Sequence, residues 1–382
     1  MFDHKSPWIT EDLALFQNSV RRFIAEELVP NDERWAKEQC IDRDAWYKAG
    51  EAGMLLLSIP EEYGGGGGNF AHDAIMALEQ TRAISTSLGT GVHSGIVAHY
   101  ILAYASEEQK MRWLPKMASG EFVGAIAMSE PSVGSDLQNI KTKAIRDGDE
   151  YVINGSKTFI TNGYHADLIL VVCKTDPTQG ARGTSIVVVE TKDLAGFRRG
   201  RILEKLGCKG QDTVELFFDD VRVPVANLLG PEEGKGFFQL MQQLPQERMI
   251  IALGGLGTME RALADTAEYV RNRKLFGKPS LELQNTRFKL AEVKTTVTIA
   301  QAFIDDCMVK VLKRELSGEV AAMAKWWCTH NAGLVVDECL QLHGGYGYMV
   351  EYPIARQYAN TRVSRIFGGS NEIMKEIIAR TL

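Results

Sequence analysis

The sequence predicts an α+β protein in three parts, because the spacing of its apolar residues changes twice along the 382 residues. Apolar residues recur at helical spacing over 1–121, and short β-rich runs with turn signals between them fill 122–233. Long helical periods then return over 234–382. We expect an N-terminal helical domain, a compact β domain and a C-terminal antiparallel helical bundle with these boundaries.

The composition is that of a globular protein and argues against several classes of function. A net charge of −6 disfavours nucleic acid as a partner, since phosphate binding requires a basic face. The sequence has no run of ~18 apolar residues, so we expect no stable membrane insertion. The six cysteines form no C-x-x-C pair and the seven histidines no H-E-x-x-H motif, which predicts reduced thiols and no metal site.

The N-terminal part begins with a helix that Thr10 caps and Pro30 ends. A second helix is expected around Trp46, and further helices over 71–82, 91–105 and 106–117. The glycine run 64–68 lacks the Lys-Ser/Thr pair of a phosphate-binding P-loop. We expect it to be a flexible connector, and its neighbours Tyr63 and Asn69 could line the mouth of a pocket.

The middle part contains six runs with the composition of strands. Asp147-Gly148, Asn154-Gly155 and Asn162-Gly163 are turn signals between them. The expected strands are 122–127, 151–153, 158–161, 168–174, 184–190 and 214–218.

The C-terminal part predicts three long helices over 237–272, 284–316 and 318–344. Near the end, Gly368-Gly369 form a hinge before a last helix that Ser370 or Asn371 can cap. Free N–H groups at a helix start can bind an anion or a carbonyl group, although the same residues also fit a simple turn.

Five motifs in this order resemble those of acyl-CoA dehydrogenases, and the resemblance covers nearly the whole chain. In that family the N-terminal domain is helical, the middle domain is a β-barrel or sandwich, and the C-terminal domain is a four-helix bundle. The motifs begin at the following positions: AMSEPSVGSD at 127, NGSKTFITNG at 154, RKLFGK at 273, QLHGGYG at 341 and RVSRIFGGSNEI at 362. The closest likeness is to the long-chain enzyme.

The resemblance implies a bound FAD. Met128 and Ser129 would contact the polar edge of the flavin ring, Phe159 its face and Thr161 its N5 atom, while Ser135 would lie near the pyrophosphate and the substrate thioester. A second set of contacts would come from a neighbouring subunit of a homotetramer. The resemblance assigns this second set to Arg273, Gln284, Gln341 and Gly345. It adds Phe276, Gly344, Ser370 and Glu372 as further cofactor contacts.

The resemblance also implies an unusual place for the catalytic base. In short- and medium-chain members the residue matching Gly368 is the catalytic glutamate, whereas in long-chain and isovaleryl-CoA dehydrogenases the glutamate matches Glu247. The backbone N–H of Gly368 would still donate to the thioester carbonyl. Arg248 and Phe367 would contact the substrate. Without the resemblance, Glu247 could simply be an acid at a helix N-terminus.

We therefore expect an FAD-dependent dehydrogenase that converts an acyl-CoA to the trans-2-enoyl-CoA and passes electrons to an electron-transfer flavoprotein. The residues over 91–104 and Gly254-Gly255 are candidates for the acyl cavity, but chain length and branching stay open, including branched or terpenoid acyl groups. The alternatives are an oxygen-using acyl-CoA oxidase and a non-catalytic acyl-CoA- or FAD-binding protein. We expect a cytoplasmic protein, or a mitochondrial matrix protein if the chain is a processed eukaryotic one.

Overall fold

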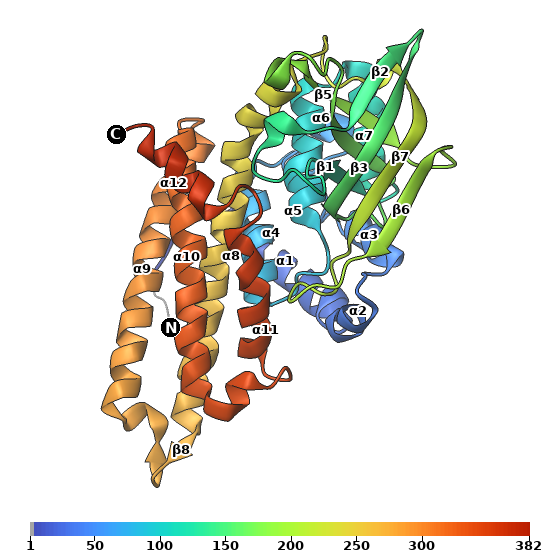
Figure 1. Cartoon of the computed structure of the whole chain (residues 1–382). Helices are drawn as coiled ribbons and strands as arrows, with labels where there is room; N and C mark the ends of the chain where they lie inside the picture. The colour runs from blue at the N-terminus through green and yellow to red at the C-terminus, as the bar shows by residue number, and fades with distance from the viewer. Residues whose placement is uncertain (1–3) are drawn as a thin grey trace.

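The computed structural model describes residues 4–382 and shows helices, then a sheet, then long helices (Figure 1). Thr10 accepts a hydrogen bond from the Leu13 N–H, as its predicted role as a cap requires. The N-terminal helices are α1 (Glu11–Phe23), α2 (Asp32–Glu38), α3 (Arg43–Glu51), α4 (Phe70–Arg82), α5 (Thr90–Val92), α6 (Ala98–Tyr104) and α7 (Glu107–Ala118). The helix expected over 91–105 is real but contains a π-helical turn, His93–Val97, between α5 and α6.

The glycine run is not the flexible connector that its composition predicts. The N–H groups of Gly65 to Gly68 each donate to a backbone carbonyl between residues 56 and 60. A Cβ atom on Gly65 would lie 2.2 Å from the carbonyl oxygen of Ile59, so glycine is required by close backbone packing. The neighbours of the run are occupied by structural contacts, since Tyr63 donates to Glu107 and Asn69 caps α4.

The middle domain is a single seven-stranded sheet in the order β1-β4-β2-β3-β7-β6, with β5 paired to β4. Only the β1–β4 and β2–β4 pairs are parallel. The strands are β1 (Gly124–Ala127), β2 (Lys143–Asp147), β3 (Glu150–Thr161), β4 (Leu168–Lys174), β5 (Thr184–Glu190), β6 (Phe197–Ile202) and β7 (Thr213–Pro224).

Two features of this sheet differ from the sequence prediction. Asn154-Gly155 is not a turn but an irregularity within the continuous strand β3, where the pairing with β7 shifts register. Strands β2 and β6 were not predicted. Most of their residues are exposed or half-buried, so they lack the apolar runs on which the prediction depended.

Strand β4 joins the two hydrophobic cores because all seven of its residues are buried. Alternate side chains point to opposite faces of a strand. Leu168, Leu170 and Val172 pack into the helical core, and Ile169 and Val171 pack into the core of the β domain. The sheet is thereby fixed rigidly against the helices.

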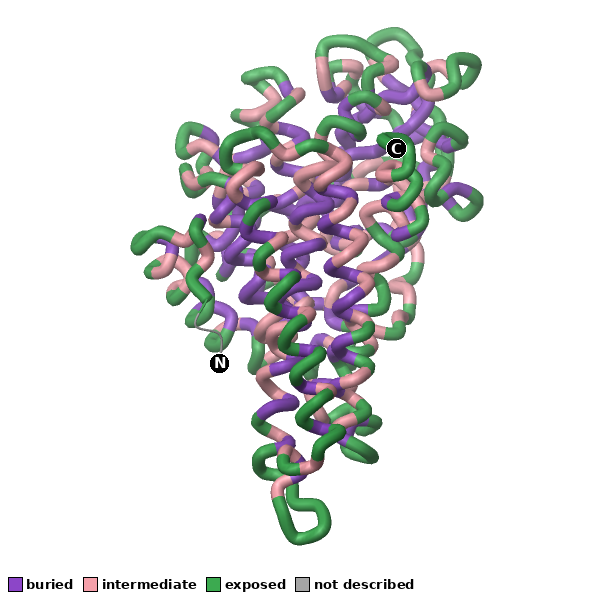
Figure 2. Tube along the Cα trace, turned by 90° about the vertical axis from the view of Figure 1, so that its left-hand side faces the viewer, coloured by how far each residue is buried: buried purple, intermediate pink, exposed green. Residues whose placement is uncertain are grey.

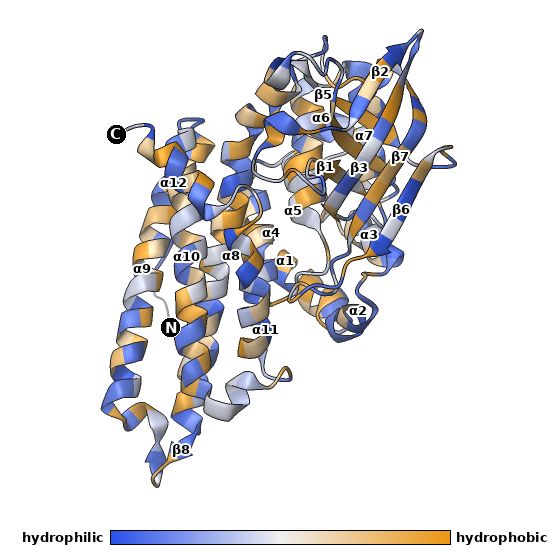
Figure 3. Cartoon of the chain, in the orientation of Figure 1, coloured by the Kyte–Doolittle hydropathy of each residue, from blue (hydrophilic) through white to orange (hydrophobic). Residues whose placement is uncertain are grey.

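The C-terminal bundle is built around α8 (Gly236–Asn272), a helix of 37 residues that packs against α4, α6, α9 and α10. The bundle helices carry both apolar and polar residues around their surfaces (Figure 3). The end of the bundle that carries β8 is mostly exposed (Figure 2). The other elements are β8 (Lys274–Leu275), β9 (Lys278–Pro279), α9 (Gln284–Leu312), α10 (Gly318–His343), α11 (Pro353–Thr361) and α12 (Asn371–Ala379).

Candidate active site

Glu247 lies in the interior of α8, eleven residues after the helix begins at Gly236. The alternative that it is an acid favoured by a helix N-terminus is therefore wrong. Its side chain is buried, and its Oε1 atom accepts a hydrogen bond of 2.8 Å from the Tyr100 hydroxyl on α6. Burial raises the pKa of Glu247 to about 7, although the Tyr100 hydrogen bond and the charge of Arg248 oppose this shift. A carboxyl with such a pKa can accept and release a proton near neutral pH.

The loop that carries Gly368 has the backbone that the sequence predicts. Gly368 and Gly369 have φ values of 63° and 86°, in the left-handed region that favours glycine. Ser370 caps α12 by accepting from the Ile373 N–H, which also settles the choice between the two predicted caps. The N–H of Gly368 meets no acceptor within residues 4–382, so it is free to bind a carbonyl oxygen.

The Gly368 loop lies against α8 one helical turn beyond Glu247. A Cβ atom on Gly368 would be 2.2 Å from the Cδ1 atom of Ile251, which follows Glu247 by four residues on the same face of the helix. A side chain at position 368 would therefore require the end of the Ile251 side chain to move. The Gly368 loop thus lies about one helical turn from Glu247, on the same face of α8.

Lys325 on α10 holds this loop in place. Its ammonium group is fully buried and donates to the Gly369 carbonyl at 2.7 Å and to the Asn371 side chain at 3.1 Å. Burial and the nearby charge of Arg248 lower the pKa of Lys325 to about 8. The second loop glycine and the start of α12 are therefore anchored to the bundle.

Arg248 is buried beside Glu247, and its Nε atom has no hydrogen-bond partner within the described chain. Burial lowers its pKa, and the Glu247 carboxylate offsets part of that effect. A buried guanidinium with an unpaired nitrogen is suited to an additional acceptor. Phe367, the other predicted substrate contact, is about half exposed in the same region.

The four predicted contacts of the flavin ring also meet, at the end of β3. The Thr158 N–H donates to the Ser129 carbonyl at 3.0 Å, and Lys157 donates to the Met128 carbonyl at 3.0 Å. Lys157 is itself buried and paired with Glu130. These contacts fix the 128–129 segment against the two residues of β3 that precede Phe159. Ser135 lies on the exposed loop that follows.

Phe159 has the properties expected of a residue that a ligand covers. Its side chain is 69% exposed, although it stands in a strand next to buried residues, and its φ is 60°. A positive φ is costly for an aromatic residue, and such strain is concentrated at ligand sites. An exposed ring near the C-terminal end of β3 fits the flat face of a flavin.

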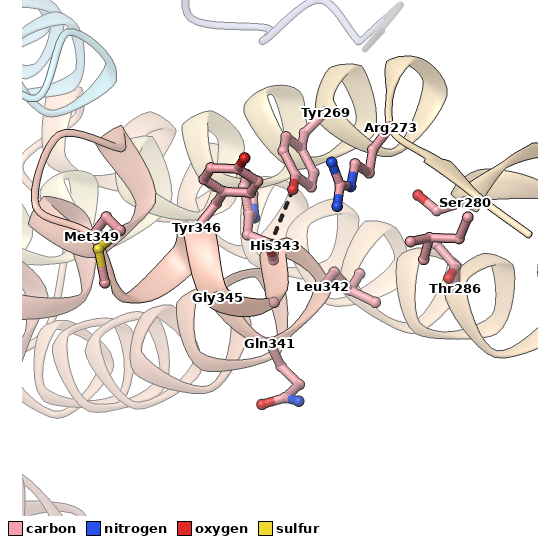
Figure 4. A pocket seen from close by; sticks show the side chains of 12 residues that line it. Tyr269, Arg273, Ser280, Thr286, Gln341, Leu342, His343, Gly345, Tyr346 and Met349 are labelled. Atoms are coloured by element: carbon pink, nitrogen blue, oxygen red, sulfur yellow. Dashed lines mark hydrogen bonds between the residues drawn. The ribbon is translucent and has the colours of Figure 1, made fainter.

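The predicted contacts from a neighbouring subunit lie elsewhere. Three of them, Arg273, Gln341 and Gly345, line a pocket of about 550 Å³ near β8, together with Gly344 (Figure 4). The Tyr269 hydroxyl donates to the His343 carbonyl in its wall. A Cβ atom on Gly345 would meet nothing within 4 Å, so the chain itself does not require glycine there, whereas a ligand lying against the backbone would.

Two further predicted cofactor contacts are at the exposed tip of the bundle. Phe276 is 94% exposed in the turn between β8 and β9, and Gln284 is the exposed first residue of α9. Arg273 stands directly after the last residue of α8 and follows Glu247 by 26 residues. At a rise of 1.5 Å per residue, the two residues are roughly 40 Å apart along the helix axis. Within one chain, the structure does not bring this set near Glu247.

The sequence did not identify Tyr100, Ile251 or Lys325 as individual residues of the site. Tyr100 was included only in the stretch 91–104, as part of a candidate cavity wall. A lysine within the apolar run of α10 is a signal that could have been used, because a buried lysine needs partners. The contact between Ile251 and Gly368 has no sequence signal, since the two residues are far apart in the chain.

Comparison with known proteins gives matches along the whole chain. Models of the N-terminal, middle and C-terminal domains of acyl-CoA dehydrogenases match residues 10–121, 125–221 and 234–382. The mitochondrial long-chain specific acyl-CoA dehydrogenase of Sus scrofa is 46% identical over 96% of this chain and 86% of that protein.

Solved structures agree with these matches. An acyl-CoA dehydrogenase from Geobacillus kaustophilus superposes with a TM-score of 0.96 and 46% identity, covering 99% of each chain. A glutaryl-CoA dehydrogenase from Mycobacterium smegmatis in complex with FADH2 gives a TM-score of 0.90 at 28% identity, over 97% of this chain and 94% of that one. None of the helices described over residues 4–382 is long and apolar enough to cross a membrane.

Proposed function

The chain belongs to the acyl-CoA dehydrogenase family, which is FAD-dependent, and we propose that Glu247 is the base with which it dehydrogenates an acyl-CoA to the trans-2-enoyl-CoA. The observation that carries this proposal is the buried Glu247 carboxyl, with a pKa of about 7, one helical turn from the Gly368 loop. In this proposal the catalytic carboxylate stands at position 247 instead of position 368, so the glycine at position 368 does not mean that the activity is lost.

The residues of this chain divide the work as follows. The Glu247 carboxylate takes the proton from the α-carbon of the thioester, and its raised pKa makes it basic enough to do so near neutral pH. The free N–H of Gly368 donates to the thioester carbonyl, whose oxygen gains charge as the proton leaves. FAD, when bound, supplies the acceptor for the hydride from the β-carbon. Met128, Ser129, Phe159 and Thr161 would hold its ring.

We also propose that the cofactor site is completed by a second copy of the chain in a homotetramer. The pocket at Arg273, Gln341 and Gly345 is roughly 40 Å along α8 from Glu247, too far to serve the same FAD within one chain. Gln284 would add a contact from the second copy, and Phe276, Gly344, Ser370 and Glu372 are the remaining proposed contacts of the cofactor. A monomer in sedimentation that retains stoichiometric FAD would contradict this proposal.

The family's partner for reoxidation is an electron-transfer flavoprotein, and we propose the same acceptor for this chain. An acyl-CoA oxidase is the enzyme alternative, and oxygen consumption without an added acceptor would support it. Chain length is proposed as medium or long, with branched or terpenoid acyl groups as the alternative. A cytoplasmic location, or the mitochondrial matrix for a processed eukaryotic protein, is tested by cell fractionation.

The decisive experiment is anaerobic mixing of the FAD-loaded protein with a panel of acyl-CoAs of different length and branching, for the wild type and Glu247→Gln. Bleaching of the flavin band in the wild type alone is expected, and its rates rank the substrates. Bleaching in both proteins would assign the base to another residue. Binding of acyl-CoA without bleaching in either would replace the enzyme with the non-catalytic binding protein.

A further inference from the structure

We propose that Tyr100 is a positioning residue of the active site: its hydroxyl orients the Glu247 carboxylate and keeps it ionised, so that the oxygen Oε2 is left to take the substrate proton. This inference rests on the proposed role of Glu247 as the base. Tyr100 itself touches neither the cofactor nor the reacting atoms in this assignment, and it acts through Glu247.

The geometry of the pair supports this role. The Tyr100 hydroxyl is 2.8 Å from Oε1 of Glu247, and both side chains are buried. Glu247 is the only acceptor of this hydroxyl within residues 4–382, and no hydrogen bond reaches Oε2 from the same residues. One carboxylate oxygen is thus held while the other is free, and a glutamate side chain that would otherwise rotate about its last bond is fixed.

The two helices that carry the pair are fixed relative to each other. Helix α6 packs on α8, and the hydroxyl of Tyr104, one turn after Tyr100, donates to the Gln242 side chain on α8 at 3.0 Å. The π-helical turn His93–Val97 also lies close to α8, since a Cβ atom on Gly95 would be 2.5 Å from the Cδ1 atom of Ile250. The Tyr100–Glu247 contact is therefore a fixed feature of this interface.

A hydroxyl that donates to a carboxylate favours the charged form over the neutral one. Burial raises the pKa of Tyr100 well above its ordinary value, so this hydroxyl stays a donor at all working pH values. The hydrogen bond lowers the pKa of Glu247 and so opposes the larger effect of burial. Tyr100 thereby keeps the base in its reactive form near neutral pH.

Other charged or titratable groups around Glu247 act differently. Arg248 on α8 also favours the carboxylate, but through its charge and without a hydrogen bond. Tyr104 on α6 packs edge-on against Tyr100, with ring centroids 6.1 Å apart, and its hydroxyl bonds to glutamine residues instead. From the C-terminal elements, Lys325 interacts with the charges of Arg248 and Glu372 rather than with the carboxylate. Removing the Tyr100 hydroxyl therefore measures the effect of this one hydrogen bond on Glu247.

The test compares Tyr100→Phe with the matched control Tyr104→Phe, each a loss of one hydroxyl from the same helix. The first measurement is the pH midpoint of Glu247 in the FAD-loaded enzyme without substrate, from the infrared carbonyl band that Glu247→Gln removes. We expect Tyr100→Phe to raise this midpoint by about one pH unit, the usual effect of one hydrogen bond to a charged group. The control should leave it at the wild-type value.

The second measurement is the pH dependence of flavin reduction by octanoyl-CoA or palmitoyl-CoA under anaerobic conditions. Tyr100→Phe should reduce the rate about tenfold at pH 6, and the difference should vanish near pH 9, where the base is ionised in both proteins. A loss of rate that is the same at every pH, with an unchanged infrared midpoint, would mean that Tyr100 serves only for packing and would overturn the proposal.

A third protein covers the case in which Tyr100→Phe does not fold. Difluorotyrosine at position 100 keeps the shape of the ring and makes its hydroxyl a stronger donor, so the Glu247 midpoint should fall below the wild-type value. An unchanged or raised midpoint would contradict the proposal. Failure of the proposed function has a different signature: flavin bleaching would be absent in the wild type or equal in Glu247→Gln, whatever the infrared midpoint does.

Discussion

The substitution Glu247→Gln should make the protein more stable above pH 7, even though it removes the proposed base. The folded-state pKa of about 7 lies above the ordinary value of 4.5, so the folded protein holds this proton more tightly than the unfolded chain does. The stabilising effect of the neutral carboxyl is complete below pH 4.5 and is lost as the pH rises to 7. Above pH 7 the wild type carries the full cost of a buried carboxylate.

The magnitude follows from the rise of the Glu247 pKa from 4.5 to about 7. At 1.36 kcal/mol per unit this is about 3 kcal/mol above pH 7 and about 1 kcal/mol at pH 5. Glutamine is nearly isosteric and can accept the same hydrogen bond from Tyr100, so packing should change little.

The assay is urea unfolding of the wild type and Glu247→Gln at pH 5 and pH 8, at equal protein concentration and with a fixed excess of FAD, because ligands and association shift apparent stability. Glu268→Gln, an exposed acid on the same helix, is the control and should show no pH-dependent gain. A difference between the wild type and Glu247→Gln that is equal at the two pH values would refute the argument from burial.

Three further predictions follow from the loop and the distant pocket. Gly368→Ala should destabilise the protein by about 1–3 kcal/mol in urea unfolding, because of its positive φ and the contact with Ile251. The double variant Gly368→Ala/Ile251→Ala should lose less free energy of unfolding than the two single variants lose together. Strictly additive losses would contradict the contact between the two residues. Lys325→Met should lower the free energy of unfolding by about 1–3 kcal/mol, since the Gly369 carbonyl loses its donor. A melting temperature equal to that of the wild type would exclude this anchoring role. Arg273→Gln should weaken FAD retention on gel filtration without moving the Glu247 infrared midpoint, and a moved midpoint would place the two groups in one site.

Much of the fold could be predicted because the signals are local. The caps at Thr10 and Ser370, the helical periods of α8 to α10 and the apolar runs of β4 and β5 each depend on residues close in sequence. The errors occurred where tertiary contacts decide the outcome. The glycine loop is ordered by carbonyls of a neighbouring segment, and Asn154-Gly155 continues a strand because β7 pairs with both sides of it.

The sequence by itself determined the family resemblance, the two glycines that the last loop needs, and the presence of Glu247 in an apolar helix. Only the tertiary structure decided what makes Glu247 chemically useful. Burial between helices and one hydroxyl from α6 set its pKa, and the Ile251 side chain packs against the Gly368 loop. Burial, hydrogen bonding and packing depend on which distant segments meet, and that information exists only after the chain has folded.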